Sequence, residues 1–264
     1  MPKIDSHVHG HPSWADLATT DQAAAKSFYG GLFGWTYEDN AMPETDEVYS
    51  MAQLNGEYAG AIFNQAPEQT AAGIPSMWTT YLAVDDADAA FAKVTAAGGT
   101  PIMEPFDVMD AGRMALVQDP SGGVAGLWQG KDHHGRGVEA EAGSVIWNEL
   151  QSTDANAASS FFTALLGWDV SKAEMDMGMD YRTVKIGDDD AAVGILQMTE
   201  DWDGMPTHWA TYFAIDDCDA SVEKAVSLGG SVLVPANDIP SGRFAVLFDP
   251  QGAAFCIITM APME

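Results

Sequence analysis

The stretch that decides the fold reads WADLATTDQAAAKSFYGGLFGW over residues 14–35, because it recurs as WNELQSTDANAASSFFTALLGW over residues 147–168. The two copies share 11 of 22 positions at a constant offset of 133. Two further pairs continue the repeat: WTTYLAVDDAD (78–88) with WATYFAIDDCD (209–219), and GRMALVQDPSG (112–122) with GRFAVLFDPQG (242–252). Motifs that recur in the same order indicate a duplication, so we expect two homologous domains.

The first half begins with a module of one strand, one helix and further strands. A short apolar strand over residues 14–19 leads to Asp21, a typical helix N-cap, and apolar residues then recur at helical spacing until Gly34. Strands are expected over residues 48–54 and 57–63, with an Asn-Gly turn between them.

The same order then repeats within the half. A strand over residues 78–84 leads to a cap at Asp86 or Asp88, a helix over residues 89–97 ends at two glycines, and three strands follow up to Trp128. The chain therefore reads as four βαβββ modules. This order predicts an α+β fold in which each domain joins two modules into a curved sheet around a cup.

A polar stretch marks the junction between the halves. Residues 129–143, QGKDHHGRGVEAEAG, are rich in Gly and charge and poor in large apolar side chains, which is typical of a linker. We expect a flexible N-terminus over residues 1–11, a first domain over 12–130, a linker over 131–143 and a second domain over 144–264.

The composition excludes several classes of partner. The chain carries 39 acidic and 11 basic side chains, a formal charge of -28. Nucleic acid and anionic membranes are bound mainly through Lys and Arg, so neither is expected as a partner. No segment approaches the roughly 18 apolar residues of a membrane helix, and the first residues lack the apolar core of a secretory signal. Two cysteines, Cys218 and Cys256, are too few for a disulfide framework, so we expect a cytoplasmic location.

The motifs together resemble the vicinal oxygen chelate superfamily. They are the strand into Asp21, the helix that ends in LFGW (32–35), the VDD turn (84–86) with its Gly-Gly stop, and the DP turn (119–120). This superfamily includes glyoxalase I, bleomycin-resistance proteins, fosfomycin-resistance proteins and extradiol dioxygenases. The resemblance covers residues 12–130 and 144–260 and is strongest to two-domain, glyoxalase-like actinobacterial members. It implies the cup fold but leaves the reaction open, because this fold hosts many chemistries.

Metal-using members of that superfamily hold a divalent ion with His, Gln or Glu side chains. The resemblance places the ligand positions of the first half at Trp14, Thr79, Gly126 and near Gly60. Those of the second half fall at Trp147, Ala210, Cys256 and near Gly194. A hard metal needs several oxygen or imidazole donors, so we expect no metal and no other cofactor. Cys256 alone is a poor site and reads more simply as a small buried residue that lines the cup.

The histidines provide few other candidates for a metal ligand or a general base. Three lie within residues 7–11, where DSHVH resembles the opening of amidohydrolase barrels, but four βαβββ modules are not such a barrel. His133 and His134 are expected to face water. His208 precedes the strand over residues 209–215 on the cup side, and its ordinary pKa near 6.5 would suit a general base. The alternative is a half-exposed histidine that is merely hydrogen-bonded.

Strand alternation places one carboxyl group in each cup. Asp16 and Glu149 lie at matched positions, two residues after Trp14 and Trp147. A buried carboxylate needs a partner, or its pKa rises and it can take part in proton chemistry. Tyr81 and Tyr212 are expected on the same faces, so each hydroxyl could bond to its carboxyl group and merely stiffen the sheet.

Tryptophans recur in the predicted strands. Trp14 and Trp147 stand at the lost metal-ligand positions and are the expected aromatic lining of the cups. Trp78 and Trp209 fall on the opposite face from the cup tyrosines, so they are expected beneath the helices.

Two of the four arginines, Arg113 and Arg243, begin the strands that lead to the DP turns. Either they bind an anionic ligand, or they pair with the cup carboxylates inside each domain. The facing of these strands is undetermined from sequence.

Three functions are compatible with these residues. The first is a metal-free protein of the bleomycin-resistance type that binds a small, partly apolar or aromatic molecule, as a monomer or homodimer. An acidic surface would favour a basic ligand. The second is an acid-base enzyme, a lyase, isomerase or hydrolase, that acts on a small carbonyl compound through Asp16, Glu149 or His208. The third is a metal-dependent glyoxalase or dioxygenase with displaced ligands.

Overall fold

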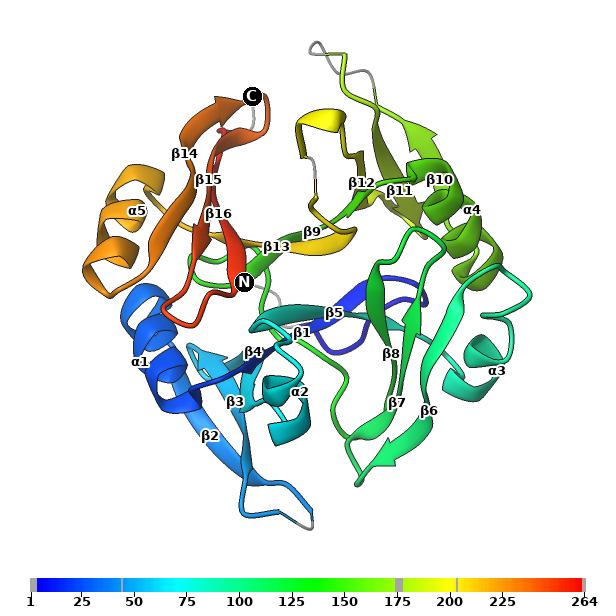
Figure 1. Ribbon diagram of the computed structural model, residues 1–264, viewed down its shortest axis with the longest axis horizontal. Coiled ribbons are helices and arrows are strands. Elements are labelled where there is room, and N and C mark those ends of the chain that lie inside the picture. The colour runs from blue at the N-terminus through cyan, green and yellow to red at the C-terminus, as the bar shows by residue number, and fades with distance from the viewer. Residues whose placement is uncertain (1–3, 44, 174–177, 203, 263–264) are drawn as a thin grey trace.

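The computed structural model describes residues 4–43, 45–173, 178–202 and 204–262. These residues form two eight-stranded sheets with helices beside them, an α+β architecture (Figure 1). The first sheet comprises β1 (Pro12–Thr19), β2 (Thr36–Ala41), β3 (Val48–Leu54), β4 (Glu57–Asn64), β5 (Met77–Ala83), β6 (Thr100–Val108), β7 (Gly112–Gln118) and β8 (Val124–Gly130). The second comprises β9 (Val145–Ser152), β10 (Asp169–Lys172), β11 (Tyr181–Ile186), β12 (Asp189–Gln197), β13 (His208–Ala214), β14 (Ser231–Ile239), β15 (Gly242–Phe248) and β16 (Ala254–Met260).

Each sheet joins two modules side by side. The strand order is β2-β3-β4-β1-β5-β8-β7-β6 in the first sheet and β10-β11-β12-β9-β13-β16-β15-β14 in the second. The modules meet where β1 pairs antiparallel with β5, and β9 with β13. The two edge strands of each sheet do not pair with each other, so the sheet curves but does not close into a barrel. The predicted α+β fold, in which each of two domains joins two βαβββ modules into one curved sheet, is confirmed.

The helices begin and end largely as the sequence predicts. The side chain of Asp21 accepts a hydrogen bond from the backbone N–H of Ala24 and begins α1 (Gln22–Phe33), which ends at Gly34. The other helices are α2 (Pro67–Ala71), α3 (Ala87–Phe91), α4 (Ala155–Leu166) and α5 (Cys218–Ser227), with a 3₁₀ turn at Glu200–Trp202. Asp86 caps α3, but this helix is shorter than the expected span of residues 89–97, because the chain continues in turns towards Gly98. The sequence analysis did not anticipate α2.

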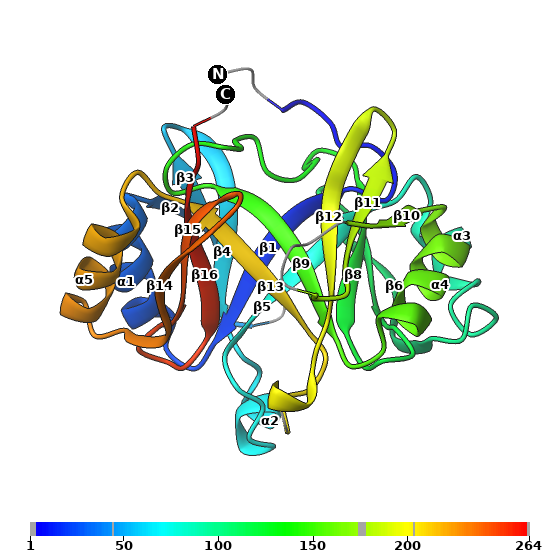
Figure 2. The same ribbon diagram turned by 90° about the horizontal axis from the view of Figure 1, so that it is seen from above.

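The helices of one domain pack on those of the other. In both views α1 lies beside α5 and α3 beside α4, with the central strands of the two sheets between these pairs (Figures 1 and 2). One hydrophobic core includes Phe28 and Phe33 of α1 together with Phe213 and Phe255 of the second sheet. A second core joins α3 to Phe161 and Phe162 of α4. Trp78 and Trp209 belong to these two cores, as predicted.

The tryptophans that end the LFGW and LLGW motifs link the domains reciprocally. Trp35 Nε1 donates to the carbonyl oxygen of Gly143 at 2.8 Å, and Trp168 Nε1 donates to that of Gly10 at 3.0 Å. Both glycines have positive φ angles, 92° and 84° respectively. A Cβ on Gly10 would lie 3.0 Å from Trp168 Nε1, so this close approach requires glycine. The repeated motif therefore serves the contact between domains.

The two helix-side cores differ at one tyrosine. Trp78 Nε1 donates to the hydroxyl of Tyr29 at 3.0 Å, and that hydroxyl donates to Asp249 Oδ2 at 3.2 Å. Phe162 occupies the matched place in the other core. There, Nε1 of Trp209 and Oδ2 of Asp119 are buried and have no hydrogen-bond partner among the described residues.

We predict that Phe162→Tyr stabilises the protein, because its hydroxyl would reach both of these buried atoms. The expected gain in the free energy of unfolding is about 1–2 kcal/mol, measured by urea or thermal unfolding. The matched variant Tyr29→Phe should lower it by a similar amount. An unchanged or lower stability of Phe162→Tyr would show that the new hydroxyl neither accepts from Trp209 Nε1 nor donates to Asp119 Oδ2.

The segments expected to be a flexible N-terminus and a linker contact the body of the protein. Within residues 4–11, Gly10 N donates to Ala83 O, and His7 Nε2 lies 3.1 Å from Arg136 O. Within residues 131–143, Arg136 and Val138 are buried. In the described parts of the chain, no helix is long and apolar enough to cross a membrane.

Candidate functional site

Each sheet has a second apolar face that points away from the helices, which we call its cup face. The cup face of the first sheet carries a largely aromatic cluster, which we call the first cup. Its members are Trp14, Met51, Ala61, Tyr81 and Trp128, with Tyr49, Tyr58, Val108, Ala111 and Met114 packed against them. Because β1, β3, β5 and β8 all contribute, the first cup depends on both modules of the domain.

Asp16 is the carboxyl group of the first cup, and 3% of it is exposed. Its Oδ2 accepts two hydrogen bonds, from the hydroxyl of Tyr81 at 2.9 Å and from that of Tyr49 at 3.0 Å. Trp14 Nε1 in turn donates to the Tyr49 hydroxyl at 2.9 Å. The other oxygen, Oδ1, is buried and finds no hydrogen-bond partner in the described chain. One oxygen of the carboxyl group is thus held by the protein, and the other has no partner among the described residues.

The electrostatics of the first cup follow from burial. Removal from water raises the pKa of Asp16 to about 7, and the hydrogen bonds from Tyr81 and Tyr49 oppose this rise only in part. Burial and the nearby Asp16 raise the pKa values of both tyrosines well above 10.0, so both remain protonated donors. At neutral pH, Asp16 therefore exchanges between a carboxylate that accepts at Oδ1 and an acid that can donate there.

The second sheet repeats this arrangement. Glu149 Oε1 accepts from the hydroxyl of Tyr212 at 3.3 Å, and Trp147 Nε1 donates to Tyr181 at 3.2 Å. Tyr181 also hydrogen-bonds to Glu149. Burial raises the pKa of Glu149 above its ordinary value. We call these residues, with Ala210, Cys256 and Ile258, the second cup.

The two cups differ in how fully the carboxyl group is satisfied. Gln151 Nε2 donates to Glu149 Oε1 at 2.8 Å, a bond for which the first cup has Ala18 at the matched place. Glu149 has no unpartnered buried oxygen among the described atoms, whereas Asp16 has one. The open hydrogen-bonding position is therefore in the first cup.

The structure brings together most of the predicted site residues. Trp14, Asp16 and Tyr81 meet in the first cup, and Trp147, Glu149, Tyr212 and Cys256 meet in the second. Burial, and then Glu149, raise the pKa of the Cys256 thiol, so it remains protonated. His208 pairs with Gln151 in the sheet, and its Nδ1 lies 2.9 Å from Pro206 O.

Of the two alternatives for the arginines, the pairing with the cup carboxylates is wrong. Arg113 pairs with Asp88 at 2.7 Å and with Asp107 at 3.3 Å, and Arg243 pairs with Asp219 at 2.8 Å. Arg113, Ala115 and Val117 are spaced two residues apart, so they share one face of β7. Ala115 and Val117 lie in a helix-side core. The strand that carries it therefore turns this side chain away from the cup, so it meets neither Asp16 nor a ligand there.

Sequence reasoning missed three residues of the cups. Tyr49 and Tyr181 were not singled out, although the repeat aligns them at an offset of 132. His133 was expected to face water, and this was wrong. Its ring lies 4.5 Å from that of Trp14, and its Nε2 is buried. No periodicity in the polar linker signalled this position.

The residues at the family's ligand positions do not fit a divalent metal. A Cβ on Gly126 would lie 2.1 Å from the Tyr81 ring, and one on Gly194 would lie 2.2 Å from the Tyr181 hydroxyl. Tyrosines thus fill the space where ligand side chains would begin. In the described residues, no three His, Cys, Asp or Glu side chains group in a way that could hold a metal ion. We therefore derive no step through a metal.

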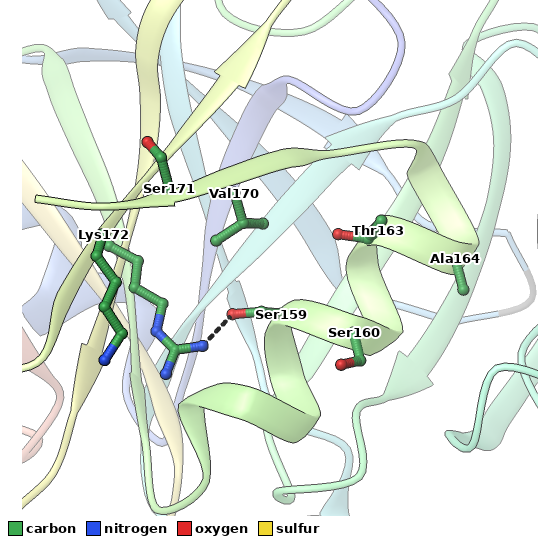
Figure 3. Close-up of a pocket in the computed structure, with 8 residues that line it drawn as sticks. Ser159, Ser160, Thr163, Ala164, Val170, Ser171 and Lys172 are labelled. Carbon is green, nitrogen blue, oxygen red and sulfur yellow. Dashed lines mark hydrogen bonds between the residues drawn. The ribbon is translucent and has the colours of Figure 1, made fainter.

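A shallow hollow lies elsewhere, on the helix side of the second domain. Ser160, Thr163 and Ala164 of α4 line it together with Val170, Ser171 and Lys172 of β10 (Figure 3). Arg182 at its base donates to Ser159 Oγ at 2.9 Å and to Asn156 Oδ1 at 2.8 Å. The polar groups that could receive a ligand are already used within the protein, so the hollow is not our candidate site.

Comparison with known proteins assigns the family. Residues 10–125 match the Glyoxalase/Bleomycin resistance protein/Dioxygenase superfamily, and residues 147–258 match the Glyoxalase-like domain. The chain belongs to this superfamily. It is 48% identical to the protein named "Putative glyoxylase CFP32" from Mycobacterium bovis, over the whole of both chains. It is 37% identical to the anthracycline biosynthesis protein DnrV of Streptomyces peucetius, covering 95% of this chain and 94% of that protein.

A solved structure shares the fold. The Mn(II)-bound glyoxalase from Novosphingobium aromaticivorans superposes with a TM-score of 0.63 at 16% identity, covering 97% of this chain and 86% of that one. The predicted membership of the superfamily is confirmed.

We predict that Asp16→Asn stabilises the protein most at high pH. The folded-state pKa of Asp16 is about 7, above its ordinary 3.8, so the folded state binds this proton more tightly than the unfolded state. Wild-type stability therefore falls as pH rises from about 4 to about 7 and then levels off. Asparagine avoids the buried charge, so the variant should gain on the order of 2–4 kcal/mol at about pH 8. That gain should shrink towards about pH 4.

Thermal unfolding of both proteins across this pH range measures the difference. Glu38→Gln is the control, because Glu38 lies on β2 and is exposed. A stability difference that does not change with pH would contradict a raised pKa at Asp16.

Proposed function

We propose that the chain binds a small, neutral, aromatic molecule in the first cup and holds a hydroxyl group of that molecule against Asp16. The observation that carries this proposal is the buried, unpartnered Oδ1 of Asp16 within an aromatic cluster, in the described part of the chain. A buried acceptor without a partner is costly, and a ligand hydroxyl would remove that cost.

The lining of the first cup supports an apolar ligand. Phe106 pairs with Met114 in the sheet, and Met103 pairs with Leu116, so these side chains share the cup face. Phe106 is 42% exposed and Met103 is 43% exposed, although both are large and apolar. They extend the aromatic cluster to the solvent, as expected of the mouth of an apolar binding site.

The charge of the site argues against an anionic ligand. The polar atoms that contact Asp16 are tyrosine hydroxyls, and Arg113, the expected cation, lies on the other face of the sheet. An anionic group would meet the Asp16 carboxylate without compensation. The relative DnrV is named for anthracycline biosynthesis, and anthracyclines are planar polycyclic phenols. A neutral phenol agrees with both observations.

We predict that naphthol binds more tightly than methylnaphthalene, which has a similar shape but no hydroxyl. A hydrogen bond to a charged acceptor contributes roughly 1.5–3 kcal/mol, so the expected ratio of affinities is roughly ten-fold to a hundred-fold. Isothermal titration calorimetry at about pH 8, where Asp16 is a carboxylate, measures it. The ratio should shrink at about pH 5.5, because the protonated acid no longer accepts as strongly.

Asp16→Asn should reduce the preference for naphthol, because a hydrogen bond from a neutral amide to the ligand hydroxyl would replace a stronger one from that hydroxyl to a carboxylate. Tyr49 and Tyr81 both donate to Oδ2, so the asparagine oxygen would take that place and its amide N–H₂ would face the ligand. Glu149→Gln, in the second cup, is the matched control and should leave the preference unchanged. Equal binding of both naphthalenes by the wild type, or an undiminished preference in Asp16→Asn, would refute the proposal.

Acid-base catalysis at the same carboxyl group is the second candidate function. A pKa of about 7 suits a group that takes and returns a proton at neutral pH. The Asp16 carboxylate would remove a proton from the carbon beside a ligand carbonyl, which leaves an enolate and a carboxylic acid. Return of the proton to a carbon of the enolate completes an isomerisation or an exchange.

If this second function holds, the protein accelerates deuterium exchange beside the carbonyl of tetralone, a bicyclic aromatic ketone, in heavy water. The protein-dependent rate should rise with pH and level off above about 7, as Asp16 loses its proton. Proton NMR follows the exchange. Asp16→Asn should remove the acceleration and Glu149→Gln should retain it. Equal rates in the wild type and in Asp16→Asn would exclude this role.

A further inference from the structure

The segment after β8 crosses the first cup. We call residues 131–137 the strap. At one end the backbone N–H groups of Lys131 and His133 donate to Ala111 O, at 2.9 and 3.0 Å, in the turn between β6 and β7. At the other end Arg136 N donates to Ser13 O and Gly137 N donates to Tyr58 O, both at 2.8 Å.

The two ends of the strap therefore rest on different modules. Ala111 belongs to the second module of the domain, whereas Ser13 and Tyr58 belong to the first. Figure 1 shows the green segment after β8 leaving that strand and running across to the start of β9. The strap spans the sheet from one rim of the first cup to the other.

His133 is the strap residue that points into the first cup. Its ring lies 4.5 Å from Trp14, 5.6 Å from Tyr58 and 5.8 Å from Trp128. Trp128 Nε1 donates to the backbone oxygen of His133 at 2.9 Å, so the residue is held by main-chain bonds on both sides. The position of the ring is thus set by the strap, and its side-chain nitrogens are not needed to hold it.

The Nε2 atom of His133 is a second open polar position. It is buried and has no hydrogen-bond partner within the residues that the structure describes. Burial, assisted by the neighbouring His134, lowers the pKa of His133 to about 4, so the ring is neutral at physiological pH. A neutral imidazole nitrogen donates or accepts according to its tautomer, and a ligand hydroxyl can match either.

A series of contacts joins the two residues that carry an unpartnered atom, His133 and Asp16. The indole of Trp14 meets the His133 ring edge-on, and its Nε1 leads through the Tyr49 hydroxyl to Asp16. Trp14 thus connects the two residues that carry an open polar atom, His133 by a direct ring contact and Asp16 through the Tyr49 hydroxyl.

We propose that His133 contacts the ligand and determines specificity, so that the first cup selects a neutral aromatic molecule with two hydroxyl groups, one for Asp16 and one for His133. This inference rests on the proposed binding function and adds the second hydroxyl and the strap to it. The strap supplies a recognition group that neither βαβββ module of the domain contains.

The test compares naphthol with a set of dihydroxynaphthalene isomers by isothermal titration calorimetry of the full chain. At least one isomer should bind five-fold to ten-fold more tightly than naphthol, as expected for one added hydrogen bond. His133→Phe keeps a ring against Trp14 but has no polar atom. It should abolish the difference between the affinity for that isomer and the affinity for naphthol.

Two further variants test whether the effect is specific to the polar side chain at position 133. His134→Phe alters the exposed neighbour and should retain the full preference for the dihydroxy isomer. His133→Gln restores a polar end and should recover part of that preference. A near-ultraviolet circular dichroism spectrum of His133→Phe that matches the wild type shows that the strap and the first cup are intact.

The outcomes separate the two proposals. If naphthol binds in an Asp16-dependent way but no isomer binds more tightly, or if His133→Phe keeps the preference, the role of His133 is refuted and the binding function stands. If naphthol and its dihydroxy isomers all fail to bind, the binding function is refuted, and the role of His133 falls with it.

Discussion

The desolvation of one carboxyl group is the constraint on which the candidate site depends. Asp16 is buried on β1, and its Oδ2 is held by hydroxyls from β3 of the first module and β5 of the second. The arrangement therefore exists only because the two modules pair along β1 and β5. Without the tyrosine donors, a carboxylate in this aromatic surrounding would be still less stable. With them, its pKa remains near neutrality, which leaves Oδ1 able to accept a hydrogen bond or to carry a proton. The burial of Asp16 therefore has two effects: it makes the folded state less stable at high pH, and it raises the pKa of the carboxyl group to about 7.

Duplication explains both what the two halves share and where they differ. The reciprocal bonds from Trp35 and Trp168 to the glycines before the opening strands preserve the contact between domains. Each cup keeps a tryptophan, two tyrosines and a carboxyl group at matched positions. Other positions have diverged. Gln151 satisfies Glu149 in the second cup, whereas the first cup leaves Oδ1 of Asp16 open within the described residues. The carboxyl group of the second cup is thus held by side chains of its own domain, and the first cup is the one in which we propose a ligand.

Much of this arrangement was predictable from the sequence, because repeats and strand alternation are local signals. The repeat identified the domains, and local patterns identified the cap at Asp21, a second cap at Asp86 or Asp88, and the glycine that ends α1. Alternation placed Trp14, Asp16 and Tyr81 on one face, since residues two apart on a strand share a face. Arg113 could not be placed, because nothing in its short strand marks which face is buried. His133 could not be placed either, because a polar segment without periodicity does not reveal where the chain folds back. Tyr49 and Tyr181 were within reach, since the repeat aligns them, but only the structure shows that they meet the carboxyl groups.

The central claim is that Asp16 carries a carboxyl group whose pKa lies near neutrality inside an apolar cup. Carbon-13 NMR of protein labelled at the aspartate carboxyl carbon, recorded across pH, measures this directly, and the Asp16→Asn variant assigns the signal. We predict a carboxyl carbon that titrates at about pH 7 and is missing from the variant spectrum. An Asp16 signal that titrates at about pH 4, as in a solvated aspartate, would contradict the claim.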